Sequence, residues 1–251
     1  MRFVVDSIVR FVKENNKGIW GKPVVAFADA NDPLFLKLKD VVSETHKTPH
    51  DFLDSAKTVI CYFIPFNEEI VKSNVNGAYS SKEWATAYIE TNRLIVDLNK
   101  YLSEKLEKFG YKTVILPPTH NFDEERFVSD WSHKHVGFVA GLGKFGLHNQ
   151  LITKRGCCGR LGSLITDADI VPNERPKEEF CLYKSKGICR VCVEKCKFNA
   201  LKVNSFDRKK CYEICLKNAE VHKDIGFADV CGKCVCVTPC SFEIPRLDLI
   251  V

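Results

Sequence analysis

The sequence contains no run of roughly eighteen or more apolar residues, so it predicts no membrane-spanning helix. Its N-terminus also lacks the uninterrupted apolar core of an export signal, because Asp6, Arg10 and Lys13 break the apolar stretch. We found no internal repeat and no low-complexity tract. The formal net charge of +5 is mild, and it permits an acidic partner without selecting a class of partner. These absences predict a globular protein without membrane association, in a reducing cytoplasm.

Cysteine, in contrast, is abundant near the C-terminus. Ten of the thirteen cysteines follow residue 180, and two-residue gaps separate Cys189 from Cys192 and Cys231 from Cys234. A four-iron cluster needs four thiolates around a small inorganic core, and a two-residue gap lets neighbouring sulfurs reach adjacent irons. In two-cluster ferredoxins the last cysteine of such a run crosses to the other cluster. The spacing therefore predicts two [4Fe-4S] clusters and a role in electron delivery.

The same spacing gives a provisional ligand assignment. The ligands assigned to the first cluster are Cys181, Cys189, Cys192 and Cys240. The ligands assigned to the second cluster are Cys196, Cys211, Cys231 and Cys234. Cys215 and Cys236 are left over, and they could replace Cys211 and Cys234. The run is irregular, because Lys197 stands where ferredoxins usually carry proline.

Zinc and disulfides are the alternative uses of these cysteines. Paired two-residue gaps also fit a cysteine-rich zinc site, but zinc would leave several of the ten cysteines unused. A disulfide framework needs an oxidising compartment, and the N-terminus does not resemble an export signal. Iron–sulfur clusters are therefore the favoured interpretation.

The chain is long enough for one large core and a small module. We expect an α/β (α+β) domain over residues 1–175 and a ferredoxin-like module over residues 176–251, separated by the polar segment NERPKEEF. Apolar periodicity and turn residues predict the following elements: helices over 3–16 and from Ser80 or Ser81 to Gly110, strands within 23–29, 56–66 and 112–118, and a strand, a turn at Gly156 and a returning strand over 151–167.

Residues 130–153, DWSHKHVGFVAGLGKFGLHNQLIT, are predicted to begin as a helix and end in a turn that contains Gly141, Gly143 and Gly146. These glycines follow a helix and precede a strand, which is the reverse of a dinucleotide-binding fingerprint. They could let the backbone approach a large flat ligand, or they could simply stop the helix. His133 and His135 point about 200° apart on a helix, so they cannot bind one metal ion together.

The segment HVGFVAGLGKFGLHNQLITKRGCCGRLGSLITD, followed by the cysteine run, resembles the epoxyqueuosine reductase family, which is related to the reductive dehalogenases. The resemblance is best over residues 130–240. It implies a nitroreductase-like core that holds cobalamin through backbone and polar contacts, joined to a two-cluster ferredoxin-like module. The D-x-H-x-x-G motif of other cobalamin proteins is absent, because Asp130 and His133 are three residues apart.

The resemblance also implies a reductive reaction. An external donor such as flavodoxin or ferredoxin would charge the outer cluster, and electrons would then reach the corrinoid through the inner cluster. The fuller members of the family carry a helical repeat domain that helps to grip transfer RNA, whereas this sequence stops at Val251. We therefore expect a short form whose substrate is tRNA or another acceptor.

Asp130 and His133 are the first candidates for a proton donor, with His135 and Tyr88 as further candidates. Each could instead make a structural hydrogen bond, and Asp130 would be a good N-cap. Gly141, Gly143, Gly146 and Arg160 are the residues expected to contact the cofactor, although Arg160 fits a solvated basic turn equally well. A different class of function also remains open, namely a ferredoxin-type electron-transfer protein whose N-terminal domain docks a redox partner.

Overall fold

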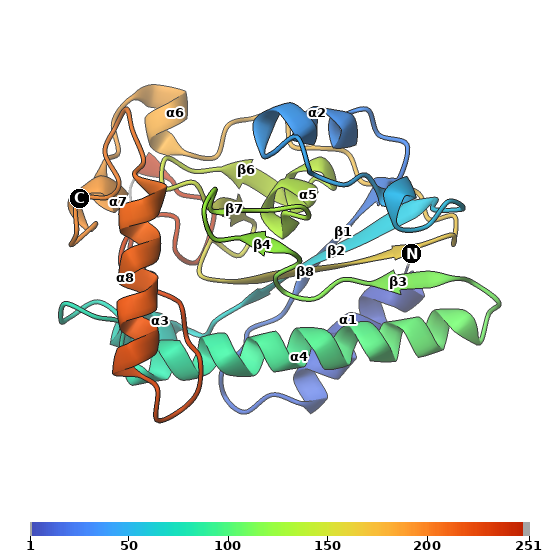
Figure 1. Cartoon of the computed structure of the whole chain (residues 1–251), viewed down its shortest axis with the longest axis horizontal. Helices are drawn as coiled ribbons and strands as arrows, with labels where there is room; N and C mark the ends of the chain where they lie inside the picture. The colour runs from blue at the N-terminus through green and yellow to red at the C-terminus, as the bar shows by residue number, and fades with distance from the viewer. Residues whose placement is uncertain (1, 248–251) are drawn as a thin grey trace.

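A four-stranded antiparallel sheet lies at the centre of the computed structural model, which describes residues 2–247 (Figure 1). The strand order is β1-β2-β8-β3, and every neighbouring pair is antiparallel. The strands are β1 (Val24–Asp29), β2 (Thr58–Pro65), β3 (Thr113–Ile115) and β8 (Gly159–Thr166). All eight residues of β2 are buried, as expected for a β-branched and aromatic run at the centre of a sheet. The fold is therefore of the mixed α+β class.

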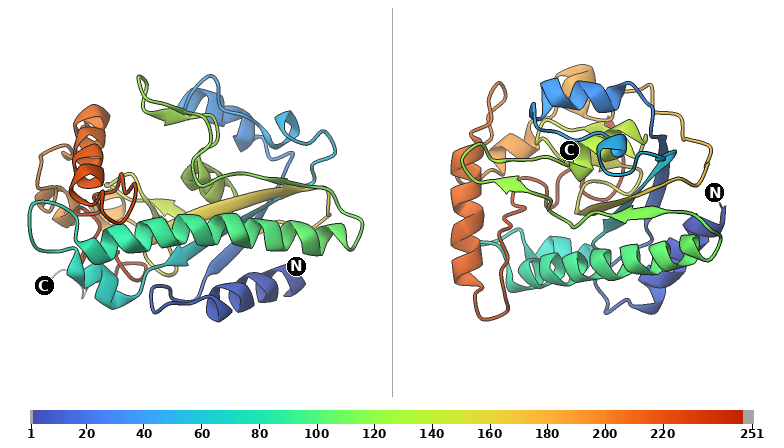
Figure 2. Two further views of the ribbon diagram at one scale, coloured as in Figure 1. Left: turned by 60° about the horizontal axis from the view of Figure 1, so that its bottom comes forward. Right: turned by 45° about the vertical axis from the view of Figure 1, so that its right-hand side comes forward.

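Helices cover both faces of this sheet (Figures 1 and 2). α1 (Arg2–Glu14) and α4 (Lys82–Glu107) pack on one face, and α2 (Leu34–Val41) and α5 (His133–Val139) pack on the other. Side chains alternate along a strand, so successive residues of β2 enter opposite hydrophobic clusters. The N-terminus of α4 is capped by Ser81, whose hydroxyl oxygen accepts the Trp84 N–H at 3.1 Å.

Shorter elements complete the described chain. They are the 3-10 helix η1 (Pro49–Asp51), α3 (Glu68–Ser73), α6 (Leu182–Lys186), α7 (Val191–Glu194), α8 (Arg208–Val221) and the two-stranded ribbons β4 (Phe122–Asp123) with β5 (Val128–Ser129) and β6 (Gly143–Phe145) with β7 (Leu151–Thr153). None of the helices within residues 2–247 has both the length and the apolar character needed to cross a bilayer.

The cysteine-rich C-terminal segment packs against one end of the sheet and the start of α4 (Figure 1). The Asn218 side-chain oxygen accepts the Ser80 N–H at 2.7 Å, and His222 Nε2 donates to the Ser80 carbonyl at 2.8 Å. The buried Lys233 ammonium donates to the Asn74 carbonyl at 2.9 Å. Because this segment shares a hydrophobic cluster with α1 and α4, a boundary between independently folding units near residue 175 stays a prediction.

Three local expectations differ from the structure. β7 and β8 are joined by the predicted turn at Gly156, but β7 pairs with β6 whereas β8 belongs to the central sheet. Gly143 begins strand β6 instead of lying in a turn. Asp130 does not cap α5, which begins after Ser132, because its carboxylate is engaged by two other side chains.

Candidate functional site

Four of the predicted cluster cysteines meet in one small cavity. These are Cys181, Cys189, Cys192 and Cys240, which line it together with His148. Burial, together with the neighbouring thiols of Cys240 and Cys181, raises the pKa of Cys192 to about 12. We call these four residues the first cysteine group.

The remaining predicted ligands meet in a second cavity of about 240 Å³. The second cysteine group, which lines it, consists of Cys196, Cys211, Cys231 and Cys234, with Cys215 beside them. Burial raises the pKa of Cys234 well above its ordinary value, and the thiols of Cys231 and Cys211 add to that effect. Cys211 and Cys215 lie one turn apart on α8 and share a hydrogen bond that lowers the pKa of Cys211 and raises that of Cys215.

The leftover cysteines differ in position. Cys215 faces the second group, so its exchange with Cys211 stays open. Cys236 is buried, accepts a hydrogen bond from the Asn74 amide at 3.3 Å and contacts Cys158. The structure thus brings the assigned ligands together in two sets of four, although their role as iron ligands stays a prediction.

The cavity of the second cysteine group also offers hydrogen-bond donors to an occupant. Trp84 lines this cavity, and its Nε1 is one of two buried side-chain polar atoms without a partner among the described residues. The Leu201 N–H donates to Cys196 Sγ at 3.3 Å. A four-thiol donor set with an N–H group directed at a sulfur is typical of an iron–sulfur cluster site, so the residues present fit this cofactor.

Three adjoining cavities surround Tyr88 on α4. One is the cavity of the second cysteine group, the next is also about 240 Å³ and is bordered by Pro118 and Lys134, and the third is about 500 Å³. Tyr88 lines all three, and Arg160 at the start of β8 lines the first two. The second cysteine group therefore adjoins a space that a large ligand could enter.

Tyr88 and Arg160 are held by a small polar network. The Tyr88 hydroxyl donates to Asp229 Oδ1 at 2.6 Å, and the Arg160 guanidinium lies 4.3 Å from the centroid of the Tyr88 ring. Arg160 Nε and Nη2 donate to Asn92 Oδ1 at 3.1 and 2.8 Å. Burial raises the pKa of Tyr88 to about 12, against the opposing effect of Arg160. The phenol is therefore protonated at neutral pH and lies beside a cation that would stabilise its anion.

His133 borders the second of these cavities, but both of its ring nitrogens have partners within the protein. Nε2 donates to the Pro117 carbonyl at 2.8 Å, and Nδ1 lies 3.0 Å from the Ser163 hydroxyl. Burial lowers the pKa of His133 to about 4. A neutral histidine with both nitrogens engaged is poorly suited to give a proton to a substrate.

Asp130 is not among the described residues that line the three cavities, although its chain neighbours Ser129 and Trp131 line the second. Its Oδ1 is 2.5 Å from His120 Nδ1, and its Oδ2 accepts from the Asn121 amide at 3.0 Å. His135 is also engaged, because its Nδ1 lies 2.8 Å from the Ser132 hydroxyl. The structure therefore assigns structural hydrogen bonds to these predicted acids, and Tyr88 is the predicted acid most central to the cavities.

The three glycines of the predicted cofactor turn are explained by contacts within the protein. A Cβ at Gly143 would meet the Ile152 carbonyl oxygen at 1.9 Å, and one at Gly141 would meet the Glu174 carbonyl oxygen at 2.8 Å. A Cβ at Gly146 would meet the His148 ring at 2.6 Å. None of the three is among the described residues lining the cavities around Tyr88. Arg160 alone of the predicted cofactor contacts borders these cavities.

Sequence reasoning did not single out His148, Gln150 or Asp229 as site residues. His148 and Gln150 lie within the glycine-rich segment, which could have drawn attention to them. No local sequence pattern points to Asp229 as a site residue, because its partner Tyr88 is 141 residues away in the chain.

The fold is similar to those of solved epoxyqueuosine reductases and a reductive dehalogenase. The enzyme from Streptococcus thermophilus is 19% identical with a TM-score of 0.55, and the match covers 95% of this chain and 67% of that protein. The Bacillus subtilis enzyme, with its catalytic aspartate loop swung out of the active site, is 15% identical with a TM-score of 0.60, covering 98% and 67%. The catabolic reductive dehalogenase NpRdhA is 16% identical with a TM-score of 0.62, covering 90% and 30%.

The sequence matched no family model and no curated protein. The predicted resemblance to epoxyqueuosine reductases is thus confirmed at the level of the fold. The chain spans about two thirds of the length of those enzymes.

Proposed function

We propose that this protein is an iron–sulfur reductase, an oxidoreductase whose two [4Fe-4S] clusters deliver electrons to a corrinoid beside Tyr88 and Arg160. The observation that carries the proposal is the position of the second cysteine group. Its cavity shares Tyr88, Gly159 and Arg160 with the next cavity, so an electron carrier held there would adjoin the space open to a ligand. The similarity in fold to epoxyqueuosine reductases and a reductive dehalogenase supports this proposal.

A bound cobalamin would supply a strongly reducing cobalt centre, which amino-acid side chains cannot provide. Arg160 and Gln150, which line both of these cavities, would make polar contacts to it. His133 and His135 are engaged by protein groups, so we propose that no protein imidazole ligates the cobalt.

Tyr88 is the proposed proton donor. Its raised pKa keeps the phenol protonated, and the Arg160 guanidinium 4.3 Å from its ring would stabilise the phenolate after the proton has left. The Tyr88 hydroxyl donates to Asp229 Oδ1 at 2.6 Å, so it would first have to turn away from Asp229 to give its proton to a substrate. Asp130 is the competing assignment, and it would first have to leave His120 and Asn121.

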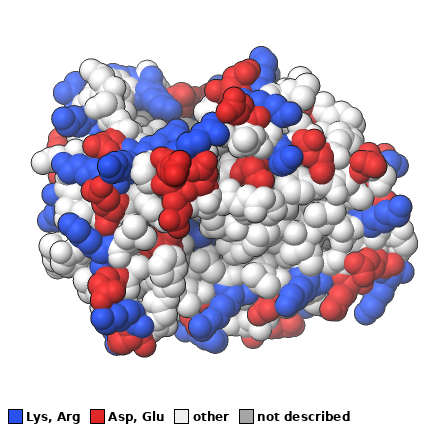
Figure 3. Space-filling model, viewed as in Figure 1, with Lys and Arg blue, Asp and Glu red and all other residues white. Residues whose placement is uncertain are grey.

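The surface beside the two cysteine groups suggests where an electron donor docks. Lys and Arg side chains, with Asp and Glu among them, are numerous over α6, α7 and the start of α8, at the upper left of Figure 3. Exposed members of this surface are Lys184, Lys186, Arg190, Lys197, Lys202, Arg208, Lys209 and Lys210. An acidic carrier such as flavodoxin or ferredoxin would be attracted to it. A tRNA substrate would also be attracted, and one of the neighbouring enzymes was solved with an epoxyqueuosine-modified tRNA stem loop.

The test is anaerobic purification followed by analysis for iron, sulfide and cobalt, before and after addition of cobalamin. We expect about eight irons per chain, since two four-iron sites are proposed, and a corrinoid absorption spectrum that changes on binding. Turnover should then be measured with epoxyqueuosine in tRNA first, and with small epoxides and organohalides next. Clusters without any cobalamin binding would favour the electron-transfer protein, and stoichiometric zinc without iron would contradict both.

A further inference from the structure

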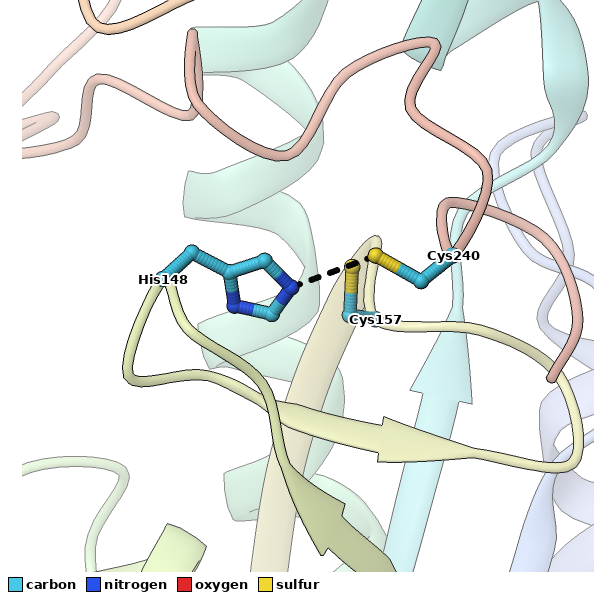
Figure 4. Close-up of side chains that lie close together, drawn as sticks. All are labelled: His148, Cys157 and Cys240. Atoms are coloured by element: carbon cyan, nitrogen blue, oxygen red, sulfur yellow. Dashed lines mark hydrogen bonds between the residues drawn. The ribbon is translucent and has the colours of Figure 1, made fainter. Parts of the chain in front are cut away.

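His148, Cys157 and Cys240 come together from three separate loops (Figure 4). His148 follows β6, Cys157 precedes β8, and Cys240 lies in the C-terminal segment. Their ligand atoms all lie within 4.8 Å of one another, and His148 Nε2 is 3.3 Å from Cys240 Sγ. Of the three, only Cys240 belongs to the first cysteine group.

The direction of the hydrogen bond from His148 follows from its other nitrogen. The backbone N–H of Gln150 donates to His148 Nδ1 at 3.0 Å, so Nδ1 is an acceptor and the ring hydrogen of the neutral imidazole is on Nε2. Nε2 therefore donates to the sulfur of Cys240. Only 3% of His148 is exposed, and the ring lies against Gly146, where a Cβ would meet it at 2.6 Å. The donor is thus held in one orientation.

Two further groups contact the same sulfur. The Thr238 hydroxyl lies 3.3 Å from Cys240 Sγ, and the Cys157 thiol is hydrogen-bonded to Cys240. The Cys157 N–H also donates to the Cys240 carbonyl at 3.0 Å, which fastens the two loops together. Cys240 therefore has three side-chain neighbours that can donate to its sulfur, whereas the contact given above for Cys196 is a backbone N–H.

We propose that His148 is a positioning residue that raises the reduction potential of the cluster held by Cys240, with Cys157 and Thr238 as weaker contributors. The proposal rests on the proposed function, because it requires Cys240 to be an iron ligand. Reduction adds negative charge that is spread over the cluster and its sulfurs. A donor to a ligating sulfur stabilises that charge, so the reduced form gains more than the oxidised form.

The position of His148 indicates that the affected cluster is the one farther from the cavities around Tyr88. His148 lines the cavities of both cysteine groups, whereas the cavity of the first group shares no lining residue with the two further cavities around Tyr88. The first cluster is accordingly the outer one, which an external donor charges. A raised potential at the outer cluster lets a weaker reductant charge it.

The experiment compares His148→Leu, which removes the donor, with His148→Gln, whose amide can still donate to Cys240. His50→Leu is the control, because His50 bonds to Asn31 and Asp54 and to no cysteine. Cluster potentials are measured on anaerobic protein by electron paramagnetic resonance during a redox titration. We expect His148→Leu to shift one of the two clusters to a more negative potential by about a tenfold change in its reduction equilibrium, about 59 mV for one electron. His148→Gln should recover most of this shift, and the other cluster should be unchanged.

Iron content separates the possible failures. Wild-type protein without iron overturns the proposed function and this inference with it. Full iron content with unchanged potentials in His148→Leu overturns the inference alone. If His148→Leu loses iron, Thr238→Val and Cys157→Ala take its place, and an unchanged potential in both overturns the proposal. The wild type could instead hold one zinc or other single metal ion that is lost when His148 or Cys157 is replaced. That result would identify a mononuclear metal site and overturn the proposal.

Discussion

The Arg160 guanidinium lies over the ring of Tyr88, 4.3 Å from its centroid, and joins the start of β8 to α4. Asp229 links this pair to the C-terminal segment, because its carboxylate accepts a hydrogen bond from the Tyr88 hydroxyl. The proposed reacting space therefore lies where the central sheet, its longest covering helix and the cysteine-rich segment meet. Changes to this pair should affect chemistry without removing the clusters.

We predict that Tyr88→Phe lowers turnover roughly a hundredfold or more, which is the usual loss when a general acid is removed. Iron content and cobalamin binding should stay at wild-type levels, because the ring and its packing are kept. Asp130→Asn tests the competing acid, and Tyr79→Phe is an exposed-tyrosine control. A large loss of turnover in Asp130→Asn, with normal turnover in Tyr88→Phe, would identify Asp130 as the proton donor in place of Tyr88.

The two cysteine groups predict how iron is lost. Cys189→Ala or Cys192→Ala should remove about four irons, one cluster, and leave the signal of the second cluster. Cys236→Ala should spare both clusters, because this thiol faces Asn74 and Cys158. Cys211→Ala and Cys215→Ala, compared side by side, identify which of the two is the ligand. Iron analysis and low-temperature spectra of anaerobic protein make the measurement, and loss of a cluster in Cys236→Ala would overturn the ligand assignment.

Gly143→Ala should destabilise the fold itself. The added Cβ would lie 1.9 Å from the Ile152 carbonyl oxygen, so β6 and β7 must separate, at a cost of about 3 kcal/mol. Gly110→Ala is the control, because its φ of +82° is strained but nothing lies within 4 Å of the new Cβ. Its cost should be roughly 1 to 2 kcal/mol. Thermal unfolding of both variants checks this order, and an unchanged Tm in Gly143→Ala would contradict the β6–β7 pairing.

His133 should make stability depend on pH. Its pKa is about 4 in the folded protein, lowered by burial from an unfolded value of 6.5. The unfolded chain therefore binds the proton first, so stability present above about pH 6.5 is lost as the pH falls toward 4, by about 3 kcal/mol in total.

Replacing His133 by glutamine should flatten this dependence without abolishing that of His135, whose pKa is also lowered, to about 3. Unfolding midpoints measured between about pH 7 and 5, above the range where clusters dissolve in acid, compare the variant with the wild type. Equal slopes in the two proteins would show that His133 is accessible to protons in the folded state.

The sequence by itself determined the local structures of this protein. Apolar periodicity and Ser81 specified helix α4, and the β-branched run of β2 specified a buried strand, because both signals act over neighbouring residues. The two-residue gaps after Cys189 and Cys231 likewise lie within short local segments.

Only the tertiary structure decided how these pieces meet. Cys240 reaches His148 across 92 residues, and Tyr88 reaches Asp229 across 141. The three glycines predicted to contact the cofactor make room for two carbonyl oxygens and the His148 ring within the protein, and a missing Cβ in the sequence does not reveal what occupies its place. Their location in the sequence is the sole argument for Asp130 and His133 as acids. In the folded protein Asp130 is hydrogen-bonded to His120, and His133 is hydrogen-bonded to Pro117 and Ser163. Contacts between distant segments depend on the packing of the whole chain, which no local pattern specifies.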